Sequence, residues 1–358
     1  MIDPSKDGAR ETSMTDGRND TMRVARGPRA KRTVALTGAD AFLGRNLIGL
    51  LEDDDRVGRI VAFDVKNPPS AGRKTRFYKV DLTQPSVDAR IAEVLAAEDV
   101  DTFLHLAFLS SPTHASAWAH ELESVGTMHV LNACRERPVR KFAMWSQTIL
   151  YGAAPSNPNF LTEAHPLKGQ TESRFLNDKI EAEQVVARFA RQMPGTVVTV
   201  LRVAPILGPT VDNYLTHYLG RRFVPTLLGF DPLMQFTHEV DALAAFKLAV
   251  MRDAPGVFNI ASEGVLPLST VIKLAGRMAL PLAHPLAYPL ARALWAAQLS
   301  EAPWMFLDYL RWVCVADTEL AQRELKWRPA FTTREAVLDH GGAQSLRDAH
   351  LMRASSHL

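Results

Sequence analysis

TVALTGADAFLG, residues 33–44, is the stretch of sequence that decides the fold. Its first five residues are apolar or β-branched, as in a buried strand, and a helical pattern of apolar residues follows over Phe42–Glu52. Gly38 allows a tight turn, the small Ala41 lets a ligand approach the backbone, and Gly44 lets the helix pack on the strand. Such a turn aims the amino end of a helix at phosphate groups. The segment therefore predicts a strand–turn–helix unit that binds a pyrophosphate, the alternative being a tight turn without a ligand.

An acidic residue follows this unit at the place where a dinucleotide-binding fold needs one. The next apolar strand, Arg59–Asp64, ends in a carboxylate. A carboxylate there accepts hydrogen bonds from the adenosine ribose and repels the 2′-phosphate of NADP, although the nearby Lys66 weakens that repulsion. The pattern therefore favours NAD over NADP as the cofactor.

Further apolar runs continue the alternation of strands and helices. They fall at Arg76–Val80, Thr102–Leu106, Lys141–Trp145, Val197–Arg202 and Gly256–Ile260. Continuous apolar strands separated by helices predict an α/β fold with a doubly wound parallel sheet of the Rossmann type. Beyond residue 205 the alternation loosens and proline becomes frequent. We therefore expect a Rossmann domain over 32–205 and a smaller, mostly substrate-binding C-terminal region over 206–340, interleaved with the Rossmann core.

The composition is that of an ordinary soluble globular protein, with 47% hydrophobic residues and a net charge of +2 from 41 basic and 39 acidic residues. That balance gives no indication of nucleic-acid binding. The two cysteines, Cys134 and Cys314, have no metal-ligand spacing, so we expect no metal, and their low number fits a reducing compartment such as the cytoplasm. Residues 1–31 are predicted to be a disordered tail and residues 341–358 a frayed one.

The segment 281–313 is unusually rich in Leu, Ala, Pro and Trp. It contains no uninterrupted apolar run of the roughly 18–20 residues that a bilayer-spanning helix needs. Charged residues at intervals indicate amphipathic helices broken at prolines, which we interpret as a cover over the substrate crevice. Peripheral membrane contact or a protein-binding face is the alternative.

Several blocks of sequence together carry a resemblance to a known family. The family's fingerprint T-G-x-x-G-F-x-G appears at Thr37–Gly44, with Ala41 in place of the middle glycine. Further matching blocks are Val80–Thr83, His105–Phe108, Ser146–Gly152, Leu201–Pro209, Gln235–Asp241 and Glu324–Pro329. From about Arg32 to Val337 the chain thus resembles the extended short-chain dehydrogenase/reductase family, also called the NAD-dependent epimerase/dehydratase family.

The resemblance implies a cofactor, a substrate class and an assembly. Contacts with NAD are implied for Gly38, Ala41, Phe42, Leu43, Gly44, Asp64, Asp81, Leu82, Leu106, Ala107 and Lys179. The implied substrate is a small molecule, a nucleotide-sugar or another carbinol, that exchanges a hydride with nicotinamide. The implied assembly is a cytoplasmic homodimer, paired through helices that include the one bearing Lys179.

The residues that carry out the family's proton transfer differ in this chain. The family's acid/base is the tyrosine of Y-x-x-x-K, which shares a helix face with the lysine, whereas this segment reads Phe175-Leu-Asn-Asp-Lys179. A phenyl ring neither donates nor accepts a proton, and general acid–base catalysis typically contributes about 10²–10⁴-fold. The family's substrate-binding Ser/Thr falls at Gln147, flanked by Ser146 and Thr148. Its N-V-x-G-T reads Glu123-Ser-Val-Gly-Thr127.

Three functions are compatible with these differences. In the first, the protein binds NAD(H) without the usual chemistry and serves as a sensor, scaffold or subunit. In the second, it is an active epimerase, dehydratase or reductase whose proton is handled by another residue. The candidate catalytic residues are then Lys179, Tyr151, Thr148 and Ser146, with His165 or His238 as further candidates because histidine titrates near neutral pH. In the third, the fold is a cofactor-free interaction module.

Overall fold

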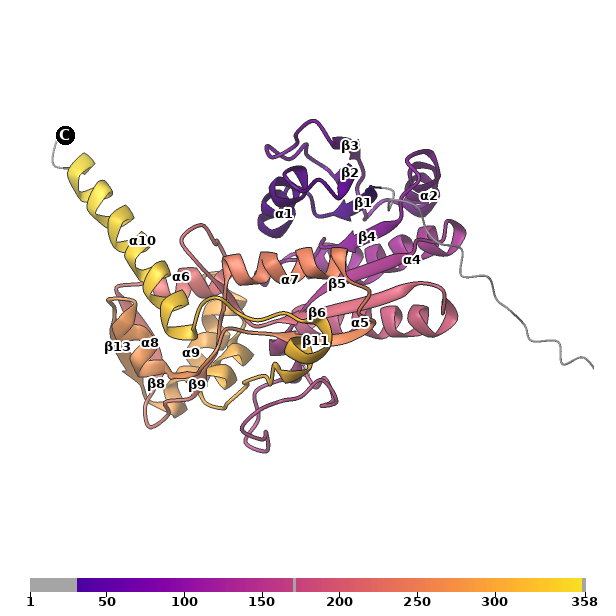
Figure 1. The fold of residues 1–358 in the computed structure, drawn as a ribbon. Helices are drawn as coiled ribbons and strands as arrows, with labels where there is room; N and C mark the ends of the chain where they lie inside the picture. Colours follow the sequence, from indigo (N-terminus) through magenta and orange to yellow (C-terminus); the bar gives the residue numbers. More distant parts are fainter. Residues whose placement is uncertain (1–30, 170–171, 356–358) are drawn as a thin grey trace, which may run out of the picture. The chain divides into compact units, whose positions relative to one another are not determined.

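The computed structural model describes residues 31–169 and 172–355 (Figure 1). Residues 1–30 of the predicted disordered tail therefore lie outside the described residues. The predicted α/β fold is confirmed, because seven parallel strands form one sheet in the order β11-β6-β5-β4-β1-β2-β3. The strands are β1 (Arg32–Thr37), β2 (Val57–Asp64), β3 (Thr75–Lys79), β4 (Thr102–His105), β5 (Lys141–Gln147), β6 (Val197–Val203) and β11 (Gly256–Ile260).

The order of the strands places a crevice at one point of the sheet. β1 pairs with β2 on one side and with β4 on the other, so the winding of the chain reverses at β1. In open parallel sheets a ligand binds at this reversal, outside the carboxyl ends of the strands. The turn after Thr37 and the end of β4 at His105 are therefore in the position where a site is expected.

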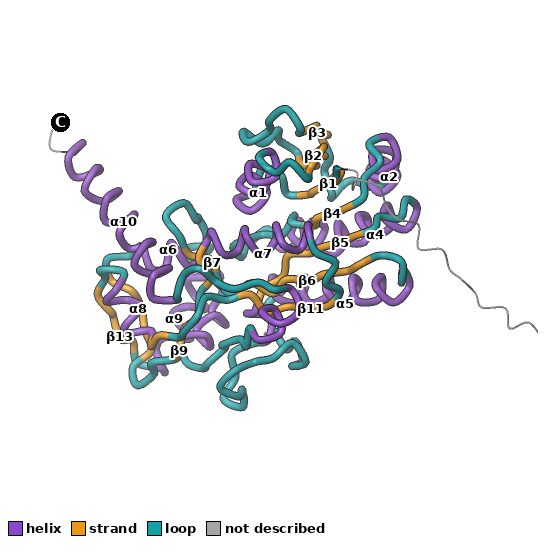
Figure 2. Tube along the Cα trace, in the orientation of Figure 1, coloured by secondary structure: helices purple, strands orange, loops and turns teal. Residues whose placement is uncertain are grey.

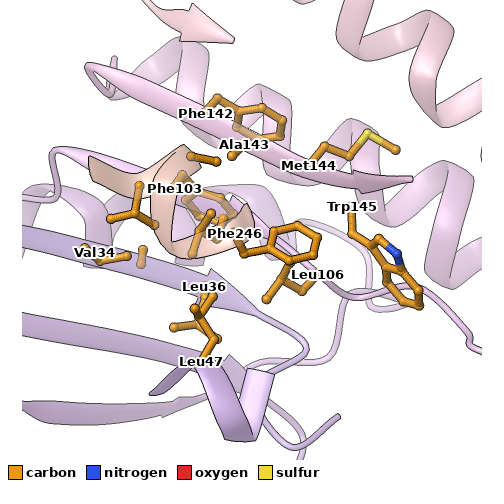
Figure 3. Packing of buried hydrophobic residues seen from close by; sticks show 14 of the residues in the cluster. Val34, Leu36, Leu47, Phe103, Leu106, Phe142, Ala143, Met144, Trp145 and Phe246 are labelled. Carbon is orange, nitrogen blue, oxygen red and sulfur yellow. The ribbon is translucent and has the colours of Figure 1, made fainter. Parts of the chain in front are cut away.

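The strands are continuously apolar because both faces of the sheet are covered. Figure 3 shows Val34 and Leu36 of β1 packed together with Phe103 of β4, Phe142 of β5 and Phe246 of α7 (Glu239–Met251). The rings of Phe103 and Phe142 stack at 6.0 Å between centroids. The covering helices form two groups (Figure 2). Helix α1 (Phe42–Glu52) packs with α7. In the other group, α4 (Gly126–Glu136) packs between α2 (Val87–Ala97) and α5 (Arg174–Gln192).

The chain beyond β6 adds a second, smaller group of elements with a core of its own. Three short ribbons pair β7 with β10, β8 with β13 and β9 with β12, and Leu215, Val224, Phe236, Leu268 and Ile272 are buried among them. The elements are β7 (Ile206–Leu207), α6 (Tyr214–Gly220), β8 (Phe223–Leu227), β9 (Leu233–Met234), β10 (Thr237–His238), β12 (Leu266–Pro267), α8 (Leu268–Leu274), β13 (Met278–Leu282), α9 (His284–Ala296), η3 (Trp304–Leu310) and α10 (Thr333–Ser355). The short helix η4 (Ala321–Leu325) instead packs on β11, and its Ala321 and Leu325 belong to the core of the main sheet.

The carboxyl-terminal helix differs from the expectation for its region. The sequence suggested a frayed tail from Gly341 onward, but α10 continues through Gly341 and Gly342 to Ser355. A Cβ at Gly341 would lie 3.0 Å from the Cα of Ala275, which shows how closely α10 packs on the end of α8. At Gly341, packing against the end of α8 therefore supports a helix where the small and polar composition of the sequence suggested an end.

Candidate cofactor and active site

The turn between β1 and α1 has the geometry of an anion site. Gly38 has a φ of +70°, a left-handed conformation that favours glycine. A Cβ at Gly38 would lie 2.8 Å from the carbonyl carbon of Leu106, and a Cβ at Gly44 would lie 2.1 Å from the carbonyl oxygen of Gly38. No side chain caps the amino end of α1 at Ala41, so backbone N–H groups of its first turn remain available to an anion.

Asp64 ends β2 beside this turn. Its Oδ2 accepts a hydrogen bond from the backbone N–H of Asp40 at 2.9 Å, and its Oδ1 accepts one from that of Val65 at 2.7 Å. A carboxylate oxygen has a second lone pair, so the oriented Asp64 can still accept a hydrogen bond from a ribose hydroxyl.

Asp81 and Leu82 lie just beyond β3, in the block matched to the adenine side. Asp81 Oδ1 accepts from the backbone N–H and the hydroxyl of Thr83 at 3.0 and 2.8 Å. Partial burial acts to raise the pKa of Asp81, but these hydrogen bonds outweigh it, and the pKa is lowered overall. Leu82 is buried, and its side chain lies within 3.1 Å of where a Cβ on Gly126 of α4 would be. Asp81 is thus ionised and held in place, while Leu82 packs under the α4 helix.

His105 connects the ends of β1 and β4 to α4. Its Nδ1 lies 2.7 Å from Thr37 Oγ1 and its Nε2 lies 2.9 Å from Thr127 Oγ1. The Thr127 hydroxyl donates to the Glu123 carbonyl oxygen, so it accepts from His105 Nε2–H, and Nδ1 accepts from Thr37. Complete burial lowers the pKa of His105 to about 3, so the ring is neutral. The Thr37 hydroxyl also accepts from the Leu106 N–H at 3.2 Å, which fixes the chain at Leu106 and Ala107.

Lys179 makes an ion pair in the interior of the protein. Its Nζ donates to Glu123 Oε1 at 2.5 Å and lies 3.9 Å from the centroid of the Phe175 ring. The Lys179 side chain is 2% exposed and that of Glu123 is 1% exposed. Burial lowers the pKa of Lys179, opposed by the Glu123 carboxylate, and burial raises the pKa of Glu123, opposed by Lys179. The ammonium therefore lies between a carboxylate and a phenyl ring.

A π-helical turn presents Glu123 to this lysine. η1 (Glu121–Val125) joins α3 (Ser116–His120) to α4 within one continuous helical stretch. Such single π turns are rare and occur often at functional sites. Glu123 Oε1 also accepts from the backbone N–H of Leu109 at 2.6 Å. The sequence showed that a glutamate replaces the family's asparagine here, but not that this glutamate reaches Lys179.

Ser146, Thr148 and Tyr151 are all buried. The Tyr151 hydroxyl donates to Asn259 Oδ1 at 2.8 Å and accepts from Arg202 at 2.9 Å. Arg202 in turn pairs with Glu183 at 2.7 Å, and the Ser146 hydroxyl also donates to Glu183. Burial raises the pKa of Tyr151, opposed by Arg202. Ser146 and Tyr151 thus belong to one buried polar network that ties β5, α5, β6 and β11 together. Thr148 begins the short 3₁₀ helix η2 (Thr148–Tyr151) that follows β5.

The two candidate histidines lie in other surroundings. His238 caps α7, where its Nδ1 accepts from the Val240 N–H at 3.2 Å. Its Nε2 lies 3.0 Å from Asp339, and its ring stacks on Phe331 with centroids 3.8 Å apart. His165 is half-buried in the loop before α5. The structure does not bring either histidine together with Lys179 through any of the contacts of the described residues.

A cleft at the carboxyl edge of the sheet connects the phosphate turn to the residues after β5. Two polar atoms that are buried here, Trp145 Nε1 and Gln147 Oε1, have no hydrogen-bond partner in the described part of the chain. Orphaned polar atoms of this kind in a cleft are consistent with a polar ligand. The lining residues are Ala41, Phe42, Leu43, Leu106, Phe108, Ser110, Trp145, Gln147, Ile149, Val203, Ala204, Pro205, Ile206, Val211, Asp212, Asn213 and Tyr214.

The aromatic 3₁₀ helix η3 covers Phe175. The ring of Phe306 lies 6.1 Å from that of Phe175 and 5.3 Å from that of Tyr214, both edge to face. The Tyr309 hydroxyl donates to the carbonyl oxygen of Ile149 at 2.6 Å, which attaches η3 to the end of η2. The apolar segment 281–313 signalled a cover over the crevice, but its composition alone did not show that η3 packs on position 175.

Comparisons with known proteins agree with this architecture. The sequence profile of the NAD dependent epimerase/dehydratase family matches residues 34–261. The uncharacterized protein Rv0501 of Mycobacterium tuberculosis (strain ATCC 25618 / H37Rv) is 33% identical over 341 residues, which cover 91% of this chain and 89% of the relative.

Solved structures resemble the fold at lower identity. UDP-glucose 4-epimerase of Thermotoga maritima, solved with UDP-glucose, has a TM-score of 0.69 at 18% identity, over 88% of this chain and 99% of that one. UDP-glucose 4-epimerase of Bifidobacterium longum, solved with NAD⁺ and UDP, has a TM-score of 0.67 at 18% identity over the same shares. Similarity at this level supports the fold alone.

Proposed function

The chain belongs to the NAD-dependent epimerase/dehydratase family, and from that premise we propose that it binds NAD(H) without the family's tyrosine-dependent hydride-transfer chemistry. One observation carries this proposal. The Lys179 ammonium packs on Phe175, a residue without a hydroxyl at the position of the family's acid/base. The charge of Lys179 is already paired with the carboxylate of Glu123. A sensor, scaffold or subunit role fits such a protein.

The phosphate end of the site fits NAD. The uncapped first turn of α1, with Ala41, Phe42, Leu43 and Gly44 around it, would hold the pyrophosphate, and Gly38 is small enough for close approach. Asp64 would accept from the adenosine ribose and Asp81 would lie on the adenine side, with Leu82, Leu106 and Ala107 as apolar or backbone neighbours. When bound, NAD would supply a hydride acceptor. The Asp40 and Asp64 carboxylates favour NAD over NADP.

The other end of the site does not fit the family's reaction. A lysine that forms a 2.5 Å pair with a buried carboxylate is poorly placed to lower the pKa of a phenol or to hold a ribose. Phe175 has no proton to exchange, and the lost acid–base catalysis corresponds to about 10²–10⁴-fold in rate. Both changes act on the same step, so either one alone is enough to impair it.

A titration of the purified protein with NADH, followed by fluorescence and repeated with NADPH, tests the cofactor proposal. We expect saturable micromolar binding of NADH and weaker binding of NADPH. Gly44→Ala should weaken NADH binding at least about tenfold, because its Cβ would clash with the turn. Gly49→Ala on the same helix is the matched control, since a Cβ there meets nothing within 4 Å. Binding of neither nucleotide would overturn the proposal in favour of the interaction module.

Asp64→Ala separates recognition from folding. It leaves the turn glycines intact and removes the carboxylate that favours the ribose 2′-hydroxyl. We expect the preference for NADH over NADPH to shrink while circular dichroism shows an intact fold. An unchanged preference would show that Asp64 has no part in recognition.

Active catalysis is the second candidate function, and the cleft gives it one supporting observation. Trp145 Nε1 and Gln147 Oε1 are orphaned there, and Gln147 occupies the position of the family's Ser/Thr. A small-molecule substrate, a nucleotide-sugar or another carbinol, would contact them. Tyr151 is a poor replacement acid/base because Arg202 and Asn259 engage its hydroxyl. Product analysis with UDP-glucose and UDP-glucuronic acid in the presence of NAD tests this candidate directly.

The assembly and location implied by the family remain part of the proposal. Trp118 of α3 and Met128 of α4 are 49% and 38% exposed, which supports a homodimer through the α3–α4 stretch and its neighbour α5. Sedimentation at several concentrations would test it. Both cysteines are free, in keeping with a cytoplasmic location.

A further inference from the structure

Helix α9 presents an apolar face to solvent. Leu286, Leu290 and Leu294 lie one helical turn apart and are 70%, 50% and 38% exposed. Within α9 only Ala287 is fully buried. The opposite side packs against the protein, with the rings of Trp295 and His114 tilted at 31° and their centroids 3.8 Å apart. The helix is therefore apolar on its inner side and on its outer side, and nothing among the described residues covers the outer leucines.

The ribbon next to this helix has a second exposed apolar face. β13 pairs in register with β8, so Met278 lies beside Phe223. These two residues are 49% and 51% exposed, and Leu280, which is on the same face of β13, is 44% exposed. Val224, on the other face, is completely buried. Ala283 alone separates β13 from α9, and β8 and α9 both contact η3.

The charge of these segments has one sign. Residues 213–230 and 264–300 contain no Asp or Glu, although the whole chain has nearly equal numbers, 39 acidic against 41 basic residues. The cations of the two segments are Arg221, Arg222, Lys273, Arg277 and Arg292. Arg221, Arg222 and Arg292 are exposed. The acidic residues Asp212, Asp231, Glu263 and Glu301 border the two segments in sequence. Apolar side chains flanked by exposed cations are typical of segments that lie at the surface of an anionic membrane.

We propose that the α9 lobe surface, formed by Phe223, Met278, Leu280, Leu286, Leu290 and Leu294, attaches the protein peripherally to anionic lipid membranes. The leucines of α9 enter the boundary between headgroups and acyl chains, while the arginines bind lipid phosphates. This is an attachment at the surface, because no described helix is long and apolar enough to cross a bilayer.

The charge also argues against the other occupants of such a face. In a twofold contact between two copies, the same patch meets itself, so Arg221 and Arg222 of both copies would approach each other. On α9, Arg292 is the only charged side chain near the exposed leucines, so a protein partner would find few of the hydrogen bonds usual in a protein–protein interface. An anionic lipid surface satisfies both the apolar face and its cationic flanks.

Vesicle flotation with the full chain tests the proposal. We expect the protein to float with vesicles of equimolar phosphatidylcholine and phosphatidylglycerol, much less with phosphatidylcholine alone, and less at high salt. Leu286→Glu/Leu290→Glu should reduce flotation at least about tenfold. Leu338→Glu, on α10 and 38% exposed, is the matched control and should float like the parent.

Three outcomes would overturn it. They are no flotation with either vesicle, equal flotation of the double variant and the parent, or a dimer that Leu290→Glu dissociates in the absence of any vesicle binding. The third would assign the face to a second copy. Circular dichroism confirms that each variant is folded, and the NADH titration of the double variant keeps this result independent of the proposed cofactor function.

Discussion

Two regions of the molecule, the phosphate turn after β1 and the surroundings of Lys179, differ in how closely their residues follow the family's sequence pattern. At the phosphate turn, Gly38 has a left-handed conformation, Gly44 packs closely against the turn, and Asp64 accepts a hydrogen bond from the Asp40 N–H. Around Lys179, Phe175 stands where the family has a tyrosine, and Glu123 holds the Lys179 ammonium in a buried ion pair. In the function that we propose, NAD(H) binding and hydride transfer depend on these separate sets of residues, so one can be lost while the other remains intact.

The largest effect is expected when the family's residues are restored around Lys179. Phe175→Tyr combined with Glu123→Asn supplies the phenol and releases Lys179 from its carboxylate, so hydride transfer should rise by about 10²–10⁴-fold over the parent. Phe175→Tyr alone should gain little, because Glu123 still holds the ammonium. The measurement is product analysis with UDP-glucose or UDP-glucuronic acid and NAD, because epimerisation and dehydration return the hydride and leave no net change in nicotinamide absorbance. No gain in the double variant would mean that substrate geometry has diverged as well.

The second prediction breaks the ion pair itself. Glu123→Ala leaves the Lys179 charge buried and unpaired, which should cost about 3–5 kcal/mol of unfolding free energy in urea. Glu123→Leu/Lys179→Met should recover most of that loss, since it removes both charges. Glu93→Ala is the control: its side chain is 69% exposed in a surface pair with Arg90, and a change of no more than about 0.5 kcal/mol is expected. Equal losses for Glu123→Ala and Glu93→Ala would contradict a buried pair.

A smaller effect is expected at Tyr151. Tyr151→Phe removes the hydroxyl that joins Arg202 to Asn259 and should cost about 1–3 kcal/mol of stability. NADH affinity should stay the same, because the hydroxyl belongs to the buried polar network with Arg202 and Asn259 and makes no contact with the phosphate turn. If turnover is found in the parent and disappears in a stable Tyr151→Phe protein, Tyr151 is the acid/base after all.

The smallest predicted effect is a pH dependence of stability that arises from the buried His105, which contacts Thr37 at the start of the phosphate turn. The pKa of His105 is about 3 in the folded protein and near 6.5 when unfolded, so the unfolded state binds more protons between these values. The contribution of His105 to the free energy of unfolding is therefore fully present above pH 6.5 and decreases as the pH drops below that value. Urea unfolding between about pH 7 and pH 5 should show this slope, and His105→Gln should flatten it. The same slope in both proteins would assign the dependence to other groups.

The sequence predicted most of the fold because both of its signals are local. Continuous apolar runs and the glycine turn placed β1, α1 and the other strands of the main sheet within a few residues. The candidate site was predicted less well. That Phe175 replaces a tyrosine was visible in a five-residue motif. The partner of Lys179, in contrast, is 56 positions away in sequence and lies in the π-helical turn η1.

The sequence by itself determined the parallel sheet, the phosphate turn and the absence of a phenol before Lys179, since each depends on residues close together in the chain. Tertiary structure alone decided that Glu123 neutralises Lys179, that η3 covers Phe175, and that Tyr151 is used to hold Arg202 and Asn259. It also decided that α9 shows its leucines to solvent. The physical reason is that burial and pairing are properties of distant segments packed together, and no local pattern specifies which of two apolar faces of a helix will be covered.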